Sequence, residues 1–308
     1  MSDPIVLLCP GQGAQAIGMG KAWAEHSAAA RAVFDAADAF LGDSLGSPLS
    51  SICFDGPEER INQTDVSQPA LYTCGVACWA AMQEASPELR PAVVAGLSLG
   101  EYTALHLAGA MDFEVGLSLV ATRGRLMQEA ADAINSSMVA LIGADEEQAR
   151  AVCAEAADGE VLVPANFNAP GQIVISGTTG ACDRALGVAE AKGLRATRLA
   201  VAGAFHSPLM QPAADRMAEA LAEAALRSPS VPVFSNVTAV EHDPNDLELL
   251  KQRLVEQIVS PVLWAQTCQA LAALGSSGGY HELAPGSVLR GLMRRTDRSI
   301  KVQSHDQP

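Results

Sequence analysis

The pattern of apolar and polar positions in the N-terminal third predicts two buried strands that each end in a sharp turn. Residues 5–9 form a short apolar run that stops at the turn 10–13, where two glycines permit a tight bend. Residues 92–95 form a second apolar run, which leads through another glycine-containing turn into a helical pattern at 99–108. Between the two runs, residues 68–84 carry apolar side chains at helical spacing. This part of the chain therefore predicts strand, helix, strand and helix.

Between residues 133 and 201 the pattern predicts a separate unit of six elements in the order βαββαβ. Asp145 and Gln148 are spaced as a capping box at the start of its first helix, and Gly193 is placed to end its second helix. Its strands are expected at residues 138–142, 161–167, 172–176 and 195–201. Because this order is that of the ferredoxin-like unit, we predict a small inserted subdomain at residues 133–201.

The flanking segments, residues 1–132 and 202–308, then form one larger, discontinuous α/β domain. Its C-terminal part is expected to add a strand, a helix, a strand and a helix, at residues 233–236, 247–259, 279–283 and from about residue 287.

Composition excludes several classes of protein. Of the 308 residues, 49% are hydrophobic and only 18% are charged, which excludes intrinsic disorder. A formal charge of −15 argues against nucleic acid as a partner. No apolar run reaches the roughly 18–20 residues that span a bilayer, and the first run is far shorter than a signal-peptide core. We therefore expect a cytoplasmic protein that does not bind membranes.

The seven cysteines argue against both a disulfide framework and a zinc site. They are odd in number, lie in apolar segments, and show no CxxC spacing and no clustered histidines. We expect them to be reduced core residues, and we expect no metal.

The first candidate for chemistry is Ser98 in the pattern Gly96-x-Ser98-x-Gly100. Between a strand and a helix, this pattern is the nucleophile elbow, in which the glycines permit so sharp a turn that the serine hydroxyl stands exposed. The alternative is a glycine-rich turn that binds phosphate or only packs, but no Lys or Thr follows as in a P-loop. The sequence thus predicts an α/β fold with an α/β-hydrolase-like larger domain.

A serine nucleophile needs a base, and the sequence alone leaves two histidines open. His106 lies eight residues along the helix from Ser98, about 12 Å at 1.5 Å per residue, and is too distant. Three others lie in polar surroundings: His26, His242 and His305. His206 follows a strand in a loop, whereas His281 lies late in the chain, where a serine hydrolase usually carries its triad histidine.

Several motifs together resemble one family. In this order the chain contains Pro-Gly-Gln-Gly-Ala-Gln at 10–15, Gly-Leu-Ser-Leu-Gly-Glu-Tyr at 96–102, Arg-Gly at 123–124, Asn-Phe-Asn-Ala-Pro-Gly-Gln at 166–172 and Ala-Phe-His at 204–206. With these motifs the chain closely resembles malonyl-CoA:acyl-carrier-protein transacylases, from residue 10 to about Leu289. The resemblance implies transfer of a malonyl group through a malonyl-serine, in fatty-acid synthesis.

The resemblance also implies the catalytic roles. Ser98 would be the nucleophile and His206 the base, and the backbone N–H groups of Gln12 and Leu99 would form the oxyanion hole. The backbone carbonyl of Gln257 would orient the histidine in place of a carboxylate. His281 would then be a structural residue.

Substrate recognition is implied on the same basis. Arg123 matches the family's buried arginine, whose planar fork can hold the malonyl carboxylate; the alternative is a solvated helix residue such as Arg125. Phe205 resembles the malonyl-selecting version of its motif. The other substrate-binding residues expected from the matching motifs are Asn166, Asn168 and Gln172. One departure is Leu97, because the family often has histidine at this position. The absence of this histidine could alter the rate of transfer or the hydrolytic leakage of the acyl-enzyme.

The implied partners are malonyl-CoA and acyl carrier protein, with no cofactor, and we expect a monomer. Since carrier proteins are acidic, docking needs a local cationic patch on this acidic chain. The densest cation groups are Arg195, Arg198, Arg290, Arg294 and Arg295, for which a solvated surface is the alternative.

Three alternative functions remain: a polyketide or malonate-decarboxylase acyltransferase, a serine hydrolase that uses His281, and a silent scaffold that binds carrier proteins.

Overall fold

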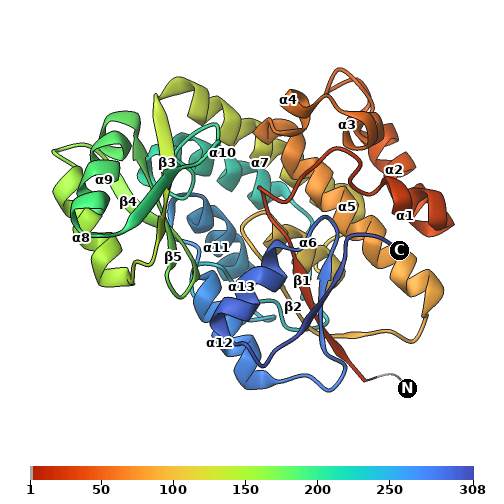
Figure 1. The fold of residues 1–308 in the computed structure, drawn as a ribbon. Coiled ribbons are helices and arrows are strands. Elements are labelled where there is room, and N and C mark those ends of the chain that lie inside the picture. The colour runs from red at the N-terminus through yellow and green to blue at the C-terminus, as the bar shows by residue number, and fades with distance from the viewer. Residues whose placement is uncertain (1–2) are drawn as a thin grey trace.

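Two parallel strands, β1 (Ile5–Cys9) and β2 (Pro91–Gly96), begin the larger sheet of the computed structural model, which describes residues 3–308 (Figure 1). The sheet continues with β7 (Tyr280–Leu283) and β8 (Val302–His305) in the order β2-β1-β7-β8, and every pairing is parallel. All five side chains of β1 are buried. A continuous apolar run is what a strand covered on both faces requires.

Helices cover the two faces of this sheet. On one face, α12 (Trp264–Leu274) and α13 (Val288–Thr296) pack against Val6 and Leu8. On the other face, α5 (Thr64–Ala85) and α7 (Phe113–Ala133) share a core with Ile5 and Leu7. The helices outside the smaller lobe are α1 (Lys21–His26), α2 (Ala28–Leu41), α3 (Leu49–Asp55), α4 (Glu58–Ile61), α5 (Thr64–Ala85), α6 (Gly100–Leu107), α7 (Phe113–Ala133), the 3-10 turn η1 (Pro208–Met210), α10 (Gln211–Glu223), α11 (Leu247–Val259), α12 (Trp264–Leu274) and α13 (Val288–Thr296).

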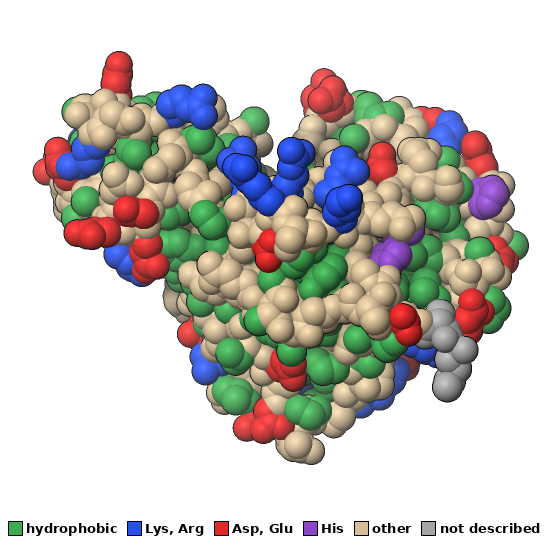
Figure 2. Space-filling view, turned by 60° about the horizontal axis from the view of Figure 1, so that its bottom comes forward, with side chains coloured by type: hydrophobic (Ala, Val, Ile, Leu, Met, Phe, Trp, Pro, Cys, Tyr) green, Lys and Arg blue, Asp and Glu red, His purple; other side chains and the backbone are tan. Residues whose placement is uncertain are grey.

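The smaller lobe contains a second, antiparallel sheet. Its elements are β3 (Ser136–Ile142), α8 (Glu146–Ala156), β4 (Leu162–Ala169), β5 (Gln172–Thr178), α9 (Thr179–Ala191) and β6 (Arg195–Arg198), with the strand order β4-β5-β3-β6. The predicted capping box of Asp145 and Gln148 is present. In Figure 2 a notch separates this lobe from the rest of the molecule.

The two faces of the smaller sheet have different partners. Val139 on β3 and Ile175 on β5 pack with α8 and α9, whereas Met138 and Val174 face the core of the larger lobe. This alternation has the period of two that a strand imposes. The inner face is therefore available to line a site between the lobes.

Strand topology explains why the two glycine-containing turns meet. β1 and β2 are adjacent and parallel, with Cys9 opposite Gly96, so their carboxyl ends lie at the same edge of the sheet. The turn after β1 and the elbow after β2 are in contact there: a Cβ built on Gly11 would lie 2.2 Å from the carbonyl oxygen of Leu97.

Two expectations for the C-terminal part need correction. Residues 233–236 do not form a strand of a sheet: Val233 and Phe234 make only isolated bridges, to Val94 and Glu241, because the chain turns away at residues 236–239. His305, which has polar neighbours in the sequence, is not in a loop or tail but lies on the sheet-edge strand β8. Within residues 3–308, no helix combines the length and apolar character needed to cross a membrane.

The elbow geometry makes a prediction for Gly100. A Cβ at this position would lie 2.1 Å from the carbonyl oxygen of Cys9, a backbone atom that cannot move alone. We expect Gly100→Ala to lower the free energy of unfolding by about 1–3 kcal/mol, as overpacking does, and to displace Ser98. Thermal unfolding checks this against Gly187→Ala on α9, where a Cβ meets nothing within 4 Å. The control should be neutral or stabilising; equal effects of the two changes would refute the steric argument.

Candidate active site

Ser98 stands on the sharp turn between β2 and α6 in a strained backbone conformation. Its φ is 53°, in the left-handed region that a side chain disfavours. The turn requires glycine at position 96, because a Cβ there would lie only 1.9 Å from the carbonyl oxygen of Gly100. Such strain, held by the surrounding fold, is typical of a functional residue.

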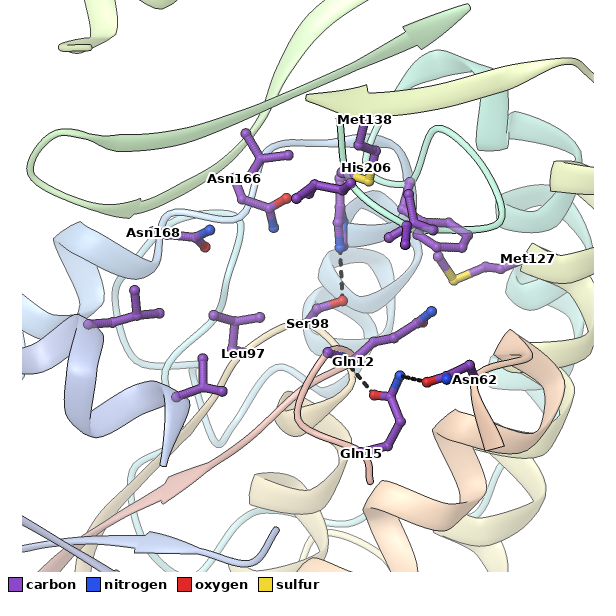
Figure 3. A pocket seen from close by; sticks show the side chains of 18 of the residues that line it. Gln12, Gln15, Asn62, Leu97, Ser98, Met127, Met138, Asn166, Asn168 and His206 are labelled. Atoms are coloured by element: carbon purple, nitrogen blue, oxygen red, sulfur yellow. Dashed lines mark hydrogen bonds between the residues drawn. The ribbon is translucent and has the colours of Figure 1, made fainter. Parts of the chain in front are cut away.

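His206 meets Ser98 from the loop between β6 and η1. Its Nε2 lies 2.8 Å from Ser98 Oγ (Figure 3), and its Nδ1 lies 2.7 Å from the backbone carbonyl oxygen of Gln257. A carbonyl oxygen only accepts, so Nδ1 carries the proton in the neutral ring and Nε2 is left as an acceptor for the serine O–H. The arrangement can therefore take a proton from Ser98.

The environment of His206 keeps the imidazole neutral. Burial lowers its pKa to about 4, the charge of Arg123 acts in the same direction, and the hydrogen bond to Gln257 opposes them. A base must be unprotonated to act, so His206 is in the competent state at neutral pH.

The other histidine that the sequence left open lies elsewhere. His281 on β7 stacks on His305, with Nδ1 of the former 2.9 Å from Nε2 of the latter, and it does not line the cavity at Ser98. His106 bonds to the backbone carbonyl of Met111. His242, expected in polar surroundings, is a loop residue that is buried, with its Nε2 2.7 Å from Glu101 Oε1, and it does not line the cavity.

Arg123 on α7 is buried beside the serine, with only 1% of its surface exposed. Nη1 donates to Gln68 Oε1 at 2.7 Å, and Nη2 donates to Gln257 Oε1 at 2.8 Å and to Ser98 Oγ at 3.1 Å. Burial lowers its pKa, but from a value so high that the guanidinium stays charged. Arg125, by contrast, is exposed and pairs with Glu129.

The charge of Arg123 has no carboxylate partner. Its hydrogen-bond acceptors are neutral, its Nε has no partner, and no carboxylate within residues 3–308 forms a salt bridge with it. The carboxylate of Glu101 acts directly on Arg123 only through its charge, which opposes the lowering of the pKa of Arg123 by burial, and forms no hydrogen bond with it. A buried cation whose hydrogen bonds are all to neutral groups can still pair with an incoming anion. The arrangement therefore favours a substrate with a carboxylate close to the carbon that Ser98 attacks.

A cavity of about 330 Å³ opens at Ser98 and Arg123. The predicted residues that line it are Gln12, Asn166, Asn168, Gln172 and Phe205, together with Ser98, Arg123 and His206. Asn168 Oδ1 is buried there without a partner. Leu99 and Gln257 are buried and do not line the cavity. Apolar side chains such as Leu97, Val288 and Leu292 form the side of the cavity toward α13. The cavity thus combines an apolar wall with a few polar groups.

Several residues of the site were not predicted from the sequence. Gln68 on α5 holds Arg123, and Asn236 holds the elbow, with Oδ1 accepting from Ser98 N–H at 2.5 Å. Gln15 and Asn62 bond to each other at the cavity edge (Figure 3). Gln15 ends the motif at 10–15, although no role was assigned to it there. No local pattern identifies Gln68, Asn62 and Asn236, because each contacts partners far away in the chain.

The five arginines expected to dock a carrier protein are all exposed. Arg198 is engaged by Asp183, whereas Arg290, Arg294 and Arg295 form no salt bridge to any carboxylate of the described chain. Figure 2 shows Lys and Arg side chains gathered at the base of the notch. Residues 3–308 contain no group of three or more His, Cys, Asp or Glu that could hold a metal ion.

Comparison with known proteins gives one consistent result. Residues 6–306 match the family model described as an acyl transferase domain. A malonyl CoA-acyl carrier protein transacylase of Escherichia coli K12 is 39% identical, over 97% of this chain and 94% of that protein.

Solved structures are similarly close. The malonyl-CoA:acyl carrier protein transacylase of Xanthomonas oryzae is 42% identical with a TM-score of 0.92, covering 100% of this chain and 96% of that one. A malonyl-transacylase solved in complex with AntF, a type II polyketide acyl-carrier protein, is 37% identical with a TM-score of 0.93, covering 99% and 96%.

The depressed pKa of His206 makes a prediction about pH. Because burial and Arg123 lower this pKa to about 4, the imidazole stays an acceptor until the pH falls to about 4, well below the 6.5 of an ordinary histidine. We expect the rate at which a sulfonyl fluoride inactivates Ser98 to hold as the pH falls from 7 and to drop only near pH 4. In Arg123→Ala the drop should move to higher pH, since one lowering charge is gone. A midpoint near 6.5 in both proteins would contradict the assignment.

Proposed function

The chain belongs to the acyl transferase family, and from that premise we propose that it transfers a malonyl group from malonyl-CoA to the phosphopantetheine thiol of acyl carrier protein, in fatty-acid synthesis. The observation that carries the proposal is Arg123: a buried, unpaired cation lies 3.1 Å from Ser98 Oγ, where the carboxylate of a short acyl group would reach it. Relatives named malonyl CoA-acyl carrier protein transacylase support it.

The proposed reaction has two half-reactions through one ester. Ser98 Oγ attacks the thioester carbonyl while His206 Nε2 takes its proton; the proton then passes to the sulfur of CoA, which leaves as a thiol. In the second half, the carrier-protein thiol gives its proton to His206 and attacks the ester. Ser98 recovers its proton from His206 as the malonyl group departs.

The proposed oxyanion hole consists of the backbone N–H groups of Gln12 and Leu99. Neither N–H donates to an acceptor within residues 3–308, and both belong to the adjacent turns that follow β1 and β2. Two unpaired donors at the serine can bind the oxygen that becomes negative in the tetrahedral intermediate.

A Ser-His dyad, rather than a triad, fits the proposed transfer. Gln257 orients His206 through a neutral carbonyl at 2.7 Å, so no carboxylate stabilises the imidazolium. An ester that must wait for a thiol gains nothing from stronger activation of water.

We also propose the roles of the cavity residues. Arg123 would hold the malonyl carboxylate in its planar fork, and Phe205 would leave no room for a methyl branch. Asn166, Asn168 and Gln172, on the inner face of the smaller sheet, would bond polar groups of the substrate. Leu97 would give the site an apolar contact where relatives of the resembled family often carry histidine.

Other features of the proposal concern the whole protein. The strand order β4-β5-β3-β6 supports an inserted ferredoxin-like subdomain at residues 133–201, within an α/β-hydrolase-like domain of residues 1–132 and 202–308. We propose that the enzyme needs no cofactor, acts as a monomer and works in the cytoplasm; its seven buried, free cysteines fit a reducing compartment.

A polyketide acyltransferase is the second candidate, because the malonyl-transacylase bound to a polyketide carrier protein has the same fold at 37% identity. The two candidates share the chemistry and differ in the carrier protein. A hydrolase that uses His281 is disfavoured by the position of that residue on β7, away from Ser98.

Intact-protein mass after mixing with malonyl-CoA tests the proposed function. We expect a malonyl adduct in the wild type, none in Ser98→Ala, and acylation slowed by several orders of magnitude in His206→Ala, because the serine then lacks a proton acceptor. His281→Ala is the matched control and should acylate normally. Collapse at His281 with no effect at His206 would favour the hydrolase instead.

Substrate choice tests Arg123. Charge-assisted bonds to the malonyl carboxylate supply about 1.5–3 kcal/mol, a factor of roughly 10 to 150, and a neutral acyl group leaves the cation unpaired. We expect Arg123→Ala to lower the malonyl-to-acetyl ratio of acyl-enzyme formation sharply, and Arg123→Lys to recover only part of it. An unchanged ratio in Arg123→Ala would remove Arg123 from substrate recognition.

Carrier-protein docking tests the arginine patch. Arg290 and Arg294 are the best targets, since the side chain of neither forms a salt bridge with a carboxylate of the described chain. We expect Arg290→Glu or Arg294→Glu to raise the KM for carrier protein and to weaken its salt dependence. Acylation by malonyl-CoA should stay nearly unchanged. Equal damage to both half-reactions would show that the change harmed the site and not the docking surface.

A further inference from the structure

One fully buried acid at the site has no role in the proposed reaction. Glu101 follows the elbow in the first turn of α6, and none of its surface is exposed. A buried carboxylate is costly unless donors surround it. Its Oε1 lies 2.7 Å from His242 Nε2, and its Oε2 accepts from Gln257 Nε2 at 2.6 Å and from the backbone N–H of Asn236 at 3.1 Å. Both oxygens of this carboxylate are therefore paired, and the carboxylate can hold His242, Gln257 and Asn236 in place.

The side-chain amide of Gln257 lies between groups of opposite hydrogen-bonding character. Its Nε2 donates to Glu101 Oε2 and, at 3.0 Å, to the backbone carbonyl of Ser98, while its Oε1 accepts from Arg123 Nη2 at 2.8 Å. A carboxylate and a carbonyl only accept, whereas a guanidinium only donates. Only one of the two orientations of this amide therefore satisfies all three neighbours.

The opposite orientation would disrupt the acyl site. It would turn the NH₂ group of Gln257 toward the guanidinium of Arg123, donor against donor, and its oxygen toward Glu101. Glu101 makes the opposite orientation costly, because its carboxylate oxygen and the amide oxygen of Gln257, which are both acceptors, would then face each other away from water. Glu101 thus reaches Arg123 through Gln257, in addition to the direct effect of its charge, which opposes the lowering of the pKa of Arg123 by burial. It does so without lining the substrate cavity.

A second branch runs from Glu101 to the nucleophile. The backbone N–H of Asn236 is held by Glu101, and the Asn236 side chain clasps the elbow: Oδ1 accepts from Ser98 N–H at 2.5 Å, and Nδ2 donates to the Gly96 carbonyl at 2.7 Å. The same carboxylate therefore supports both the guanidinium and the strained turn. His242 completes the arrangement as the donor to its other oxygen.

We propose that Glu101, held by His242, is a positioning residue for acyl selectivity: its carboxylate fixes the amide of Gln257 so that the fork of Arg123 faces the acyl cavity. The proposal rests on the proposed function, because the selectivity in question is that between malonyl and a neutral acyl group. It goes beyond that function in assigning a task to two residues outside the cavity.

Glu101→Gln is the first test, because it keeps the shape and places an NH₂ group where one acceptor stood. We expect the malonyl-to-acetyl ratio of acyl-enzyme formation to fall roughly tenfold, the effect of one charge-assisted hydrogen bond. The loss should lie mainly in the KM for malonyl-CoA. A merely structural role would lower the rates with malonyl-CoA and acetyl-CoA in parallel, and an unchanged ratio would overturn the proposal.

A pair of changes at His242 keeps the proposal testable if Glu101→Gln does not fold. His242→Gln retains an amide donor for Glu101 Oε1, whereas His242→Leu leaves this oxygen unpaired. We expect His242→Leu to lower the malonyl-to-acetyl ratio and His242→Gln to restore it toward that of the wild type. Equal ratios in the two variants would contradict the role of His242 as the anchor.

Glu282→Gln is the matched control. Glu282 on β7 is as buried as Glu101, accepts from the backbone N–H groups of Leu289 and Arg290 and from Ser304 Oγ, and contacts neither Gln257 nor Arg123. Its loss of charge should lower thermal stability without a change in the ratio; a comparable fall in the ratio would show that general destabilisation explains the effect. If the wild type itself formed no malonyl adduct or showed no preference over acetyl, the proposed function would fail, independently of the variants.

Discussion

The buried charge of Arg123 is the constraint on which the rest of the site depends. A guanidinium does not lose its proton inside a protein, so the fold must surround this one with acceptors. Three neutral groups do so from separate parts of the chain: Gln68 on α5, Gln257 on α11 and the hydroxyl of Ser98 before α6. Each acceptor is itself buried and must be positioned by its own neighbours. The close packing of α5 against α7 places Gln68, and the Glu101 network places Gln257.

Topology brings the reacting groups together with few degrees of freedom. Adjacent parallel strands place the turn after β1, which contains Gln12, and the elbow after β2, which contains Ser98 and Leu99, in contact at one edge of the sheet. Glycine is required where these turns touch, because a Cβ at Gly96 or Gly100 would collide with backbone atoms. His206 arrives from the loop that leaves the smaller lobe, and its φ of 56° shows that this loop, too, is held in a strained conformation. The site thus stores strain on both partners of the dyad.

Local patterns predicted the fold well wherever a single element carries its own signal. The apolar runs of β1 and β2, the helix at α11 and the capping box of Asp145 are all present. The strand predicted at residues 233–236 is absent, because this β-like run makes only isolated bridges before the chain turns to bring Asn236 to the elbow. The same limit applies to the site. Glu101 and His242 lie 141 positions apart in the sequence, and the residues next to either one do not predict their contact. A resemblance to a family supplies such residues only where its motifs name them, as they do for Arg123 and not for Gln68.

In the proposed reaction, recognition of the substrate and activation of the base depend on one charge, that of Arg123. The guanidinium of Arg123 is, after burial, the second cause that holds the pKa of His206 at about 4. A carboxylate that pairs with Arg123 opposes that field, so the pKa of His206 rises toward the operating pH, where a general base is most effective. A neutral acyl group would not offset the charge of Arg123, so the pKa of His206 would stay low and His206 would be a weaker base. The arrangement therefore couples the identity of the acyl group to the rate of its transfer. In the proposed malonyl-serine, a carboxylate paired with Arg123 would keep the pKa of His206 raised until the second thiol arrives.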